Sequence, residues 1–156
     1  MKNLSVKFKQ KNLHGWIRLF INSQGKKHKV SISYVFPPFN DFINFLENVL
    51  KRKNSKFSID EEGRLTEFVA QKFDKKGNFH FILRDELKPH YIYINGTYNT
   101  NDFILEFLNK FKYFLDNNFD EKRWNLKEKM PYNKVNKILR LLKLKSKKDL
   151  IKIRKI

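Results

Sequence analysis

Four of the five glycines stand in short polar segments between stretches of alternating apolar residues. These four are Gly25, Gly63, Gly77 and Gly96, and each follows a polar residue. Glycine adopts the positive φ values that tight hairpin turns require, so this spacing favours antiparallel strands joined by hairpins. The segment 91–96, which ends in Asn95-Gly96, carries the clearest hairpin pattern because both residues tolerate a type I′ turn. An antiparallel sheet is therefore predicted.

The stretches between these glycines alternate between apolar and polar residues, as half-buried strands do. In the first stretch Leu4, Val6 and Phe8 alternate with polar residues that include Lys7 and Lys9. We predict strands over 4–9, 16–21, 30–35, 57–59, 65–73, 79–83 and 91–94. The turn pattern predicts that they form one meandering antiparallel sheet of about six or seven strands.

Two stretches carry apolar residues at helical spacing. The first follows Pro37-Pro38, where Asn40 or Asp41 is available as the N-cap. Its apolar positions are Phe42, Phe45, Leu46, Val49 and Leu50. The second runs from Asn101 to Asp116 and has a wider apolar stripe, with four phenylalanines. Two amphipathic helices on one face of an antiparallel sheet make an α+β fold, which is the fold class we predict.

The C-terminal part of the chain predicts a third helix. A charged connection that holds Trp124 leads to Pro131, and from Asn133 to Leu144 apolar residues line one side while basic residues cover the rest. A length of 156 residues suits one domain. We divide it into an α+β core, residues 1–118, and a connection with a basic C-terminal helical segment, residues 119–156, packed on the same domain.

The net charge of +18 is concentrated at the two ends of the chain. Residues 1–30 hold eight Lys or Arg and no acid, residues 31–124 hold fourteen of each sign, and residues 125–156 hold twelve against Glu128 and Asp149. Codon bias explains an excess of lysine, with 27 Lys against 7 Arg, but it does not explain a neutral middle between basic ends. Both a binding surface and a compositional bias stay open as interpretations.

The absence of cysteine excludes disulfides, thiolate zinc sites and cysteine nucleophiles, and it fits a reducing compartment. The first residues contain no apolar stretch of signal-peptide length, and no later run approaches the length of a membrane span. We therefore expect a cytoplasmic protein without a transmembrane segment.

No residue pattern indicates catalysis. The histidines lack the spacing of paired metal ligands, and the acidic run Asp60-Glu61-Glu62 falls in one turn ahead of Gly63 rather than on a buried strand. The glycines are scattered singly, so no phosphate-binding loop is present. We predict no catalytic residue, no metal site and no cofactor, and we favour a non-enzymatic function.

Two segments resemble known families. Lys76-Gly77 followed by Phe79 and Phe81 resembles the aromatic strand of RNA-recognition and cold-shock domains, but Asn78 stands where those families place an aromatic residue. The alternation predicts instead that both phenylalanines face the core. The middle of the chain, from Ile32-Ser33-Tyr34 through Asp60-Glu61-Glu62-Gly63, resembles small bacterial α+β proteins of the immunity or inhibitor type. That resemblance implies a protein-binding module and transfers no functional residue.

The basic C-terminal helix is the segment from which we predict binding. Three uses fit it equally: contact with a nucleic-acid backbone, docking on an anionic membrane surface, or insertion of its apolar side into a partner's groove. The alternative is that its apolar side completes the domain's own core. The leading hypothesis is a small non-enzymatic binding protein whose basic ends engage an acidic partner, most simply a nucleic-acid backbone, and the alternative is a protein-binding inhibitor. The residues expected to carry binding are Lys134, Lys137, Arg140, Lys143, Lys147 and Lys148.

Overall fold

The computed structural model describes residues 3–10, 16–124 and 129–154, leaving aside the side chains of 144–154. Seven strands, three α-helices and one short 3₁₀ helix are assigned within these residues. In chain order they are β1 Leu4–Gln10, β2 Ile17–Ser23, β3 Lys26–Ile32, α1 Phe39–Leu50, β4 Ser55–Asp60, β5 Leu65–Gln71, β6 Asn78–Asp85, β7 Ile92–Asn99, α2 Thr100–Asn117, η1 Glu121–Arg123 and α3 Tyr132–Arg154. The α+β class predicted from the sequence is confirmed.

The strands form two antiparallel sheets, of order β1-β2-β3 and β4-β5-β6-β7. The prediction of a single meandering sheet is therefore wrong. The chain leaves the first sheet after β3, passes through Pro37 and Pro38 into α1, and begins a second sheet at β4. The outer edge of β3 is then partly occupied by a side chain, Glu61, which accepts a hydrogen bond from the Ser31 amide. Alternation within each strand contains no information about that division.

Glycine marks three of the four predicted turns. Gly25, Gly63 and Gly77 have positive φ, and Gln24 before Gly25 has a φ of 53°, so these two residues make a tight turn between β2 and β3. The predicted hairpin at Asn95-Gly96 is wrong, because both residues lie inside β7. Gly96 pairs with the buried Phe81 of β6, so strand pairing continues through this dipeptide.

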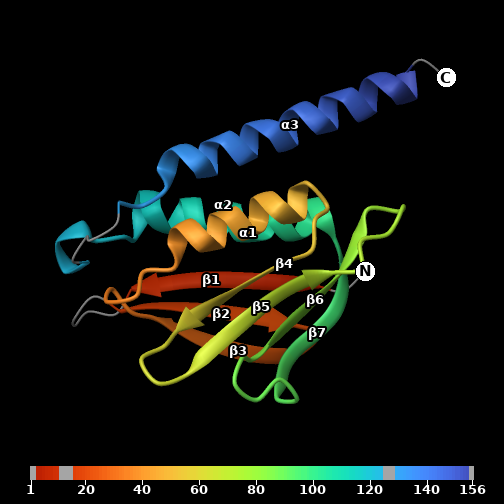
Figure 1. Ribbon diagram of the computed structural model, residues 1–156. Helices are drawn as coiled ribbons and strands as arrows, with labels where there is room; N and C mark the ends of the chain where they lie inside the picture. The colour runs from red at the N-terminus through yellow and green to blue at the C-terminus, as the bar shows by residue number, and fades with distance from the viewer. Residues whose placement is uncertain (1–2, 11–15, 125–128, 155–156) are drawn as a thin grey trace.

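The helices form a layer above the sheets (Figure 1). Helix α1 packs on β4, and α2 packs on β1 and β7. The two predicted amphipathic helices are thus present, and Asn99 caps α2 by accepting a hydrogen bond from the amide of Asp102. The predicted cap of α1 at Asn40 or Asp41 is wrong, since both residues lie inside the helix, which begins at Phe39 after Pro38.

Helix α3 lies on the side of α1 and α2 that faces away from the sheets (Figure 1). Its residues Val135, Ile138 and Leu142 are buried and belong to the same hydrophobic core as the helices below. The first part of the predicted basic helix therefore packs on its own domain. No helix among the described residues is long and apolar enough to cross a membrane.

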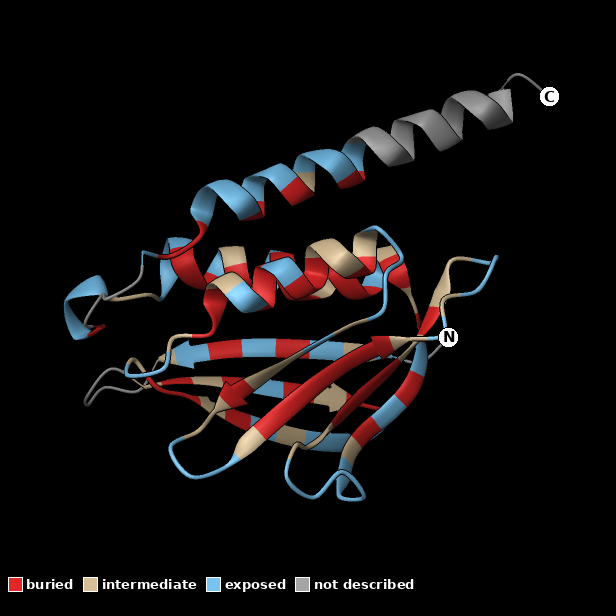
Figure 2. Ribbon diagram, in the orientation of Figure 1, coloured by how far each residue is buried: buried red, intermediate tan, exposed pale blue. Residues whose placement is uncertain are grey.

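Aromatic rings fill the space between the layers. Phe42 of α1 has ring centroids of three elements within 6.2 Å: Phe8 of β1 at 6.2 Å, Phe57 of β4 at 6.0 Å and Phe107 of α2 at 5.6 Å. This one side chain thus touches both sheets and the neighbouring helix. Figure 2 shows the same core as buried residues along β5 and the facing sides of α1 and α2.

Phe79 and Phe81 of β6 are fully buried and contact the ring of Phe103 in α2, at centroid distances of 5.0 and 4.9 Å. The expectation that they face the core is confirmed. Neither phenylalanine of this strand is therefore free to stack on a nucleic-acid base.

Candidate functional site

The outward side of β1, β2 and β3 gathers the N-terminal positive charge. Alternate residues of a strand point to opposite faces, so Val6 and Phe8 enter the core while Lys7 and Lys9 face outward. Figure 2 shows this alternation along β1. We call the outward set the basic sheet face; it consists of Ser5, Lys7, Lys9, Arg18, Phe20, Asn22, Lys27, Lys29 and Ser31.

Phe20 lies at the centre of this face. The strand register pairs it with Lys7 of β1 on one side and Lys29 of β3 on the other. Phe20 is 37% exposed, whereas its neighbours Leu19 and Ile21 are each 1% exposed. Across the three strands, an exposed aromatic ring therefore lies between two cations.

A hollow of about 470 Å³ opens around Phe20. Four lysines border it, namely Lys7, Lys27, Lys29 and Lys110, together with the polar side chains of Ser5 and Asn22. Lys110 belongs to α2, which is fixed to the edge of β1 because Glu106 accepts a hydrogen bond of 3.0 Å from the amide of Val6. No acidic residue lines this hollow, so it favours an anion.

The cations of the basic sheet face have no ion-pair partner among the residues that the structure describes. Among the described residues, no carboxylate lies within 4.0 Å of the basic groups of Lys7, Lys9, Arg18, Lys27 or Lys29. Lys110, by contrast, has its ammonium 3.7 Å from Glu106. The five cations can therefore bind an external anion without first breaking a contact within the protein.

A second hollow of about 640 Å³ adjoins the first, since Lys29 lines both. Trp16, Arg18 and Ser31 border it on one side, and the turn between β4 and β5, from Glu61 to Arg64, borders it on the other. Because this turn brings two carboxylates as well as Arg64, the charge here is mixed. The hollow around Phe20 is the more cationic of the two.

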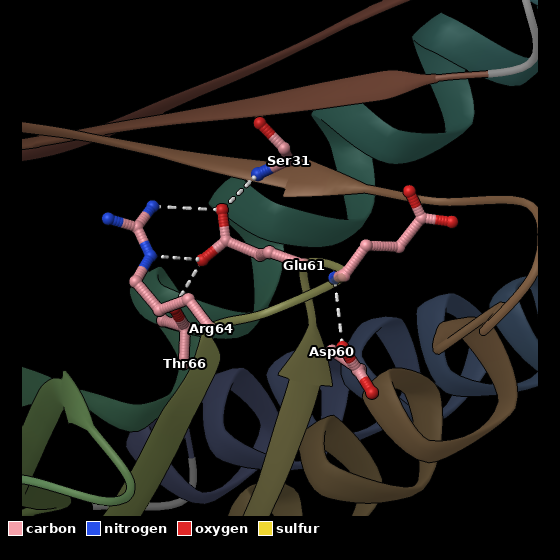
Figure 3. A network of polar contacts seen from close by, with 6 residues as sticks. Ser31, Asp60, Glu61, Arg64 and Thr66 are labelled. Atoms are coloured by element: carbon pink, nitrogen blue, oxygen red, sulfur yellow. Dashed lines mark hydrogen bonds and ion pairs between the residues drawn. The ribbon is translucent and has the colours of Figure 1, made fainter.

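Glu61 holds this turn against the first sheet (Figure 3). Its carboxylate accepts a hydrogen bond of 2.7 Å from the backbone amide of Ser31 and two of 3.0 Å from the guanidinium of Arg64. The hydroxyl of Thr66 donates a further hydrogen bond to it. The free edge of β3 is thus covered by a side chain in place of another strand, which fixes the wall of the second hollow.

The pKa of Glu61 reflects the same contacts. Burial alone would raise it, but the hydrogen bonds from Arg64, Ser31 and Thr66 outweigh burial and hold the pKa below the ordinary value of 4.5. Glu61 is therefore ionised at neutral pH and balances the charge of Arg64.

Replacing this carboxylate should destabilise the fold in a pH-dependent way. Glu61→Gln removes the charge that Arg64 and Ser31 bind, and we expect the free energy of unfolding to fall by about 2 kcal/mol at neutral pH. Because the pKa of Glu61 is lowered on folding, its contribution is present above its unfolded-state pKa and is lost as the pH falls through the folded-state pKa. Urea denaturation should therefore show the difference between the wild type and the variant shrinking as the pH falls below the unfolded-state pKa of Glu61, and vanishing below its folded-state pKa.

The matched control is Glu62→Gln, because Glu62 is exposed and its carboxylate accepts a hydrogen bond only from the Ser33 hydroxyl among the described contacts. We expect a change within about 0.5 kcal/mol. Equal effects of the two substitutions would contradict the role given to Glu61.

His28 lies beside this corner and is stacked on Tyr93, with ring centroids 3.9 Å apart and planes at 11°. Burial lowers the pKa of His28, the nearby Arg64 lowers it further, and Glu61 acts in the opposite direction. His28 is therefore neutral at neutral pH. Among the described residues, the positive charge of the basic sheet face comes from its four lysines and Arg18.

The six residues that the sequence predicts to carry binding lie on α3. Lys134, Lys137, Arg140 and Lys143 are all exposed, while Lys147 and Lys148 belong to the residues whose side chains are not described. The ammonium of Lys134 is 3.5 Å from the Asn40 side-chain oxygen, and that of Lys137 is 3.7 Å from Glu47. Helices α1 and α2 separate this group from the basic sheet face (Figure 1). The two basic ends thus form two surfaces.

The sequence predicts that the basic N-terminal end takes part in binding, but the residues predicted to bind all lie in the C-terminal helix, and none belongs to the basic sheet face. Lys7 and Lys9 alternate with core residues in the sequence, and this alternation is enough to predict that both side chains face outward. Lys27 and Lys29 were missed because the third strand was predicted to begin at Val30, whereas it begins at Lys26. Only the register of β2 with β3 sets Lys29 beside Phe20.

No family model, curated protein or solved structure matches the chain. Within the described residues, no three His, Asp or Glu side chains are placed to hold a metal ion together. The function must therefore be inferred from the surfaces themselves.

Proposed function

We propose that the protein is a small non-enzymatic binding protein that engages a nucleic-acid backbone through its basic ends, with the basic sheet face as the principal contact. The observation that carries this proposal is the row Lys7, Phe20 and Lys29, with one residue from each of three strands. These three residues border a hollow that is lined by lysines. A cationic surface interrupted by an aromatic ring is the combination used to bind phosphates and bases together.

The residue types favour backbone contact over sequence recognition. Lysine acts as a point charge on phosphates, whereas arginine makes the bidentate contacts that read base edges. The face holds four lysines and one arginine, Arg18. The exposed cations of α3 provide a second, weaker contact, since two of them already touch α1. Weak sequence preference is therefore expected.

Binding should fall steeply with salt. If the five cations of the basic sheet face each meet one phosphate, the logarithm of the association constant should fall with the logarithm of salt concentration with a slope of about −3.5 for a single strand. Fluorescence anisotropy of labelled DNA and RNA over a salt series measures this slope. Absence of binding near physiological salt, or binding insensitive to salt, would contradict the proposal.

A second candidate is a protein-binding inhibitor, favoured by the loop between β6 and β7. Leu87 and Tyr91 of this loop and Ile92, the first residue of β7, are 73%, 55% and 46% exposed. Three large apolar side chains at a hairpin tip are typical of a protein interface. This function predicts a stable complex with one protein that persists at high salt and is lost in Leu87→Asp. Persistence of such a complex in that variant would exclude the loop as its interface.

A further inference from the structure

Strand β2 and the residue before it present aromatic and polar side chains in turn on the outward side of the first sheet. Trp16, Arg18, Phe20 and Asn22 occupy alternate positions, so they share one side. Trp16 and Arg18 line the second hollow, and Phe20 and Asn22 line the first. Since a strand rises about 3.3 Å per residue, the Trp16 and Phe20 positions lie about 13 Å apart along the chain. The second hollow therefore contains the Trp16 ring, and the first contains the Phe20 ring.

The surroundings of Phe20 combine a free ring with flanking positive charge. Adjacent strands are separated by about 4.8 Å, so the lysines at positions 7 and 29 leave the sheet directly beside the ring. Their long stems lift the ammonium groups above the sheet surface. A planar group lying on the Phe20 ring would thus have a cation available on either side for its attached phosphates.

A duplex cannot use such a site fully. Its base faces are stacked inside, and its grooves are entered by a protruding helix or ribbon rather than by a ring set in a shallow hollow. A single strand exposes its base faces, and cationic grooves with aromatic rings are the usual means of holding single strands. Resting on the proposed function, we infer that the basic sheet face takes single-stranded nucleic acid, with an unpaired base stacked on Phe20 and its phosphates held by Lys7 and Lys29.

The test compares oligo(dT) with a duplex hairpin that carries the same number of phosphates, both fluorescently labelled. Wild type should bind oligo(dT) at least about 10-fold more tightly than the hairpin, and Phe20→Ala should lower the oligo(dT) affinity by about 10-fold or more. The hairpin affinity and the salt slope should stay unchanged, because no cation is removed. Phe20→Trp keeps a stacking ring and should retain the affinity.

The matched control is Phe36→Ala, since Phe36 is 48% exposed and lies in the loop between β3 and α1, outside the basic sheet face. It should bind both probes as the wild type does. Phe20 is itself partly exposed, so the alanine variant should keep the far-ultraviolet circular dichroism spectrum of the wild type.

The outcomes separate the two proposals. If Phe20→Ala binds oligo(dT) like the wild type, or if the hairpin binds as tightly as oligo(dT), single-strand selection by Phe20 is overturned while backbone binding stands. If neither probe binds the wild type in low salt, the proposed function itself fails.

Discussion

Replacing Lys7, Arg18 and Lys29 together by glutamine should lower the affinity for single-stranded DNA about 100-fold at about 0.1 M salt, because each lost phosphate contact removes about 0.7 from the salt slope. The slope itself should decrease in magnitude by about 2. These side chains leave the sheet from three different strands and have no ion-pair partner among the described residues, so their removal should leave the fold intact. Anisotropy titration at several salt concentrations measures both quantities.

A matched control exists on α3. Replacing Lys134, Arg140 and Lys143 by glutamine also removes two lysines and one arginine, here from exposed positions of α3. We expect a smaller loss of affinity than for the sheet triple. A loss as large as or larger than that of the sheet triple would move the principal contact to α3, which is where the sequence alone places it.

Phe42→Ala should cost about 3–5 kcal/mol of unfolding free energy, because the ring fills the junction between β1, β4 and α2 and its loss leaves a cavity. That loss is a large part of the stability of an ordinary domain. Urea denaturation monitored by circular dichroism measures it.

The same substitution at Phe36, where the ring is 48% exposed, should change the unfolding free energy by no more than about 0.5 kcal/mol. A cost below about 1 kcal/mol at Phe42 would show that this junction can close around the missing ring, contrary to the packing described.

Local patterns predicted the elements well. The apolar stripe from Asn101 to Asp116 matches α2, and the stripe after the two prolines matches α1, because helical periodicity is contained within one segment. Alternation likewise placed Phe79 and Phe81 in the core. These features depend on neighbours only a few residues away.

Features that depend on pairing between distant segments could not be predicted. The edge of β3 is met by Glu61, thirty positions from Ser31, and no local pattern indicates that the acidic turn would fold there. Asn95-Gly96 has the composition of a turn, yet pairing with Phe81 keeps it in a strand. The basic sheet face likewise exists only once the register has set Lys7 and Lys29 on either side of Phe20.

The two tryptophans offer the most direct test of where nucleic acid binds. Trp16 borders the second hollow beside Arg18 and Lys29, whereas Trp124 is 2% exposed and packs against Phe39. In a ¹H-¹⁵N correlation spectrum titrated with oligo(dT), the indole resonance of Trp16 should move together with the amides of β1–β3, while that of Trp124 stays in place. Shifts confined to the amides of α3, with the Trp16 indole unmoved, would contradict binding at the basic sheet face.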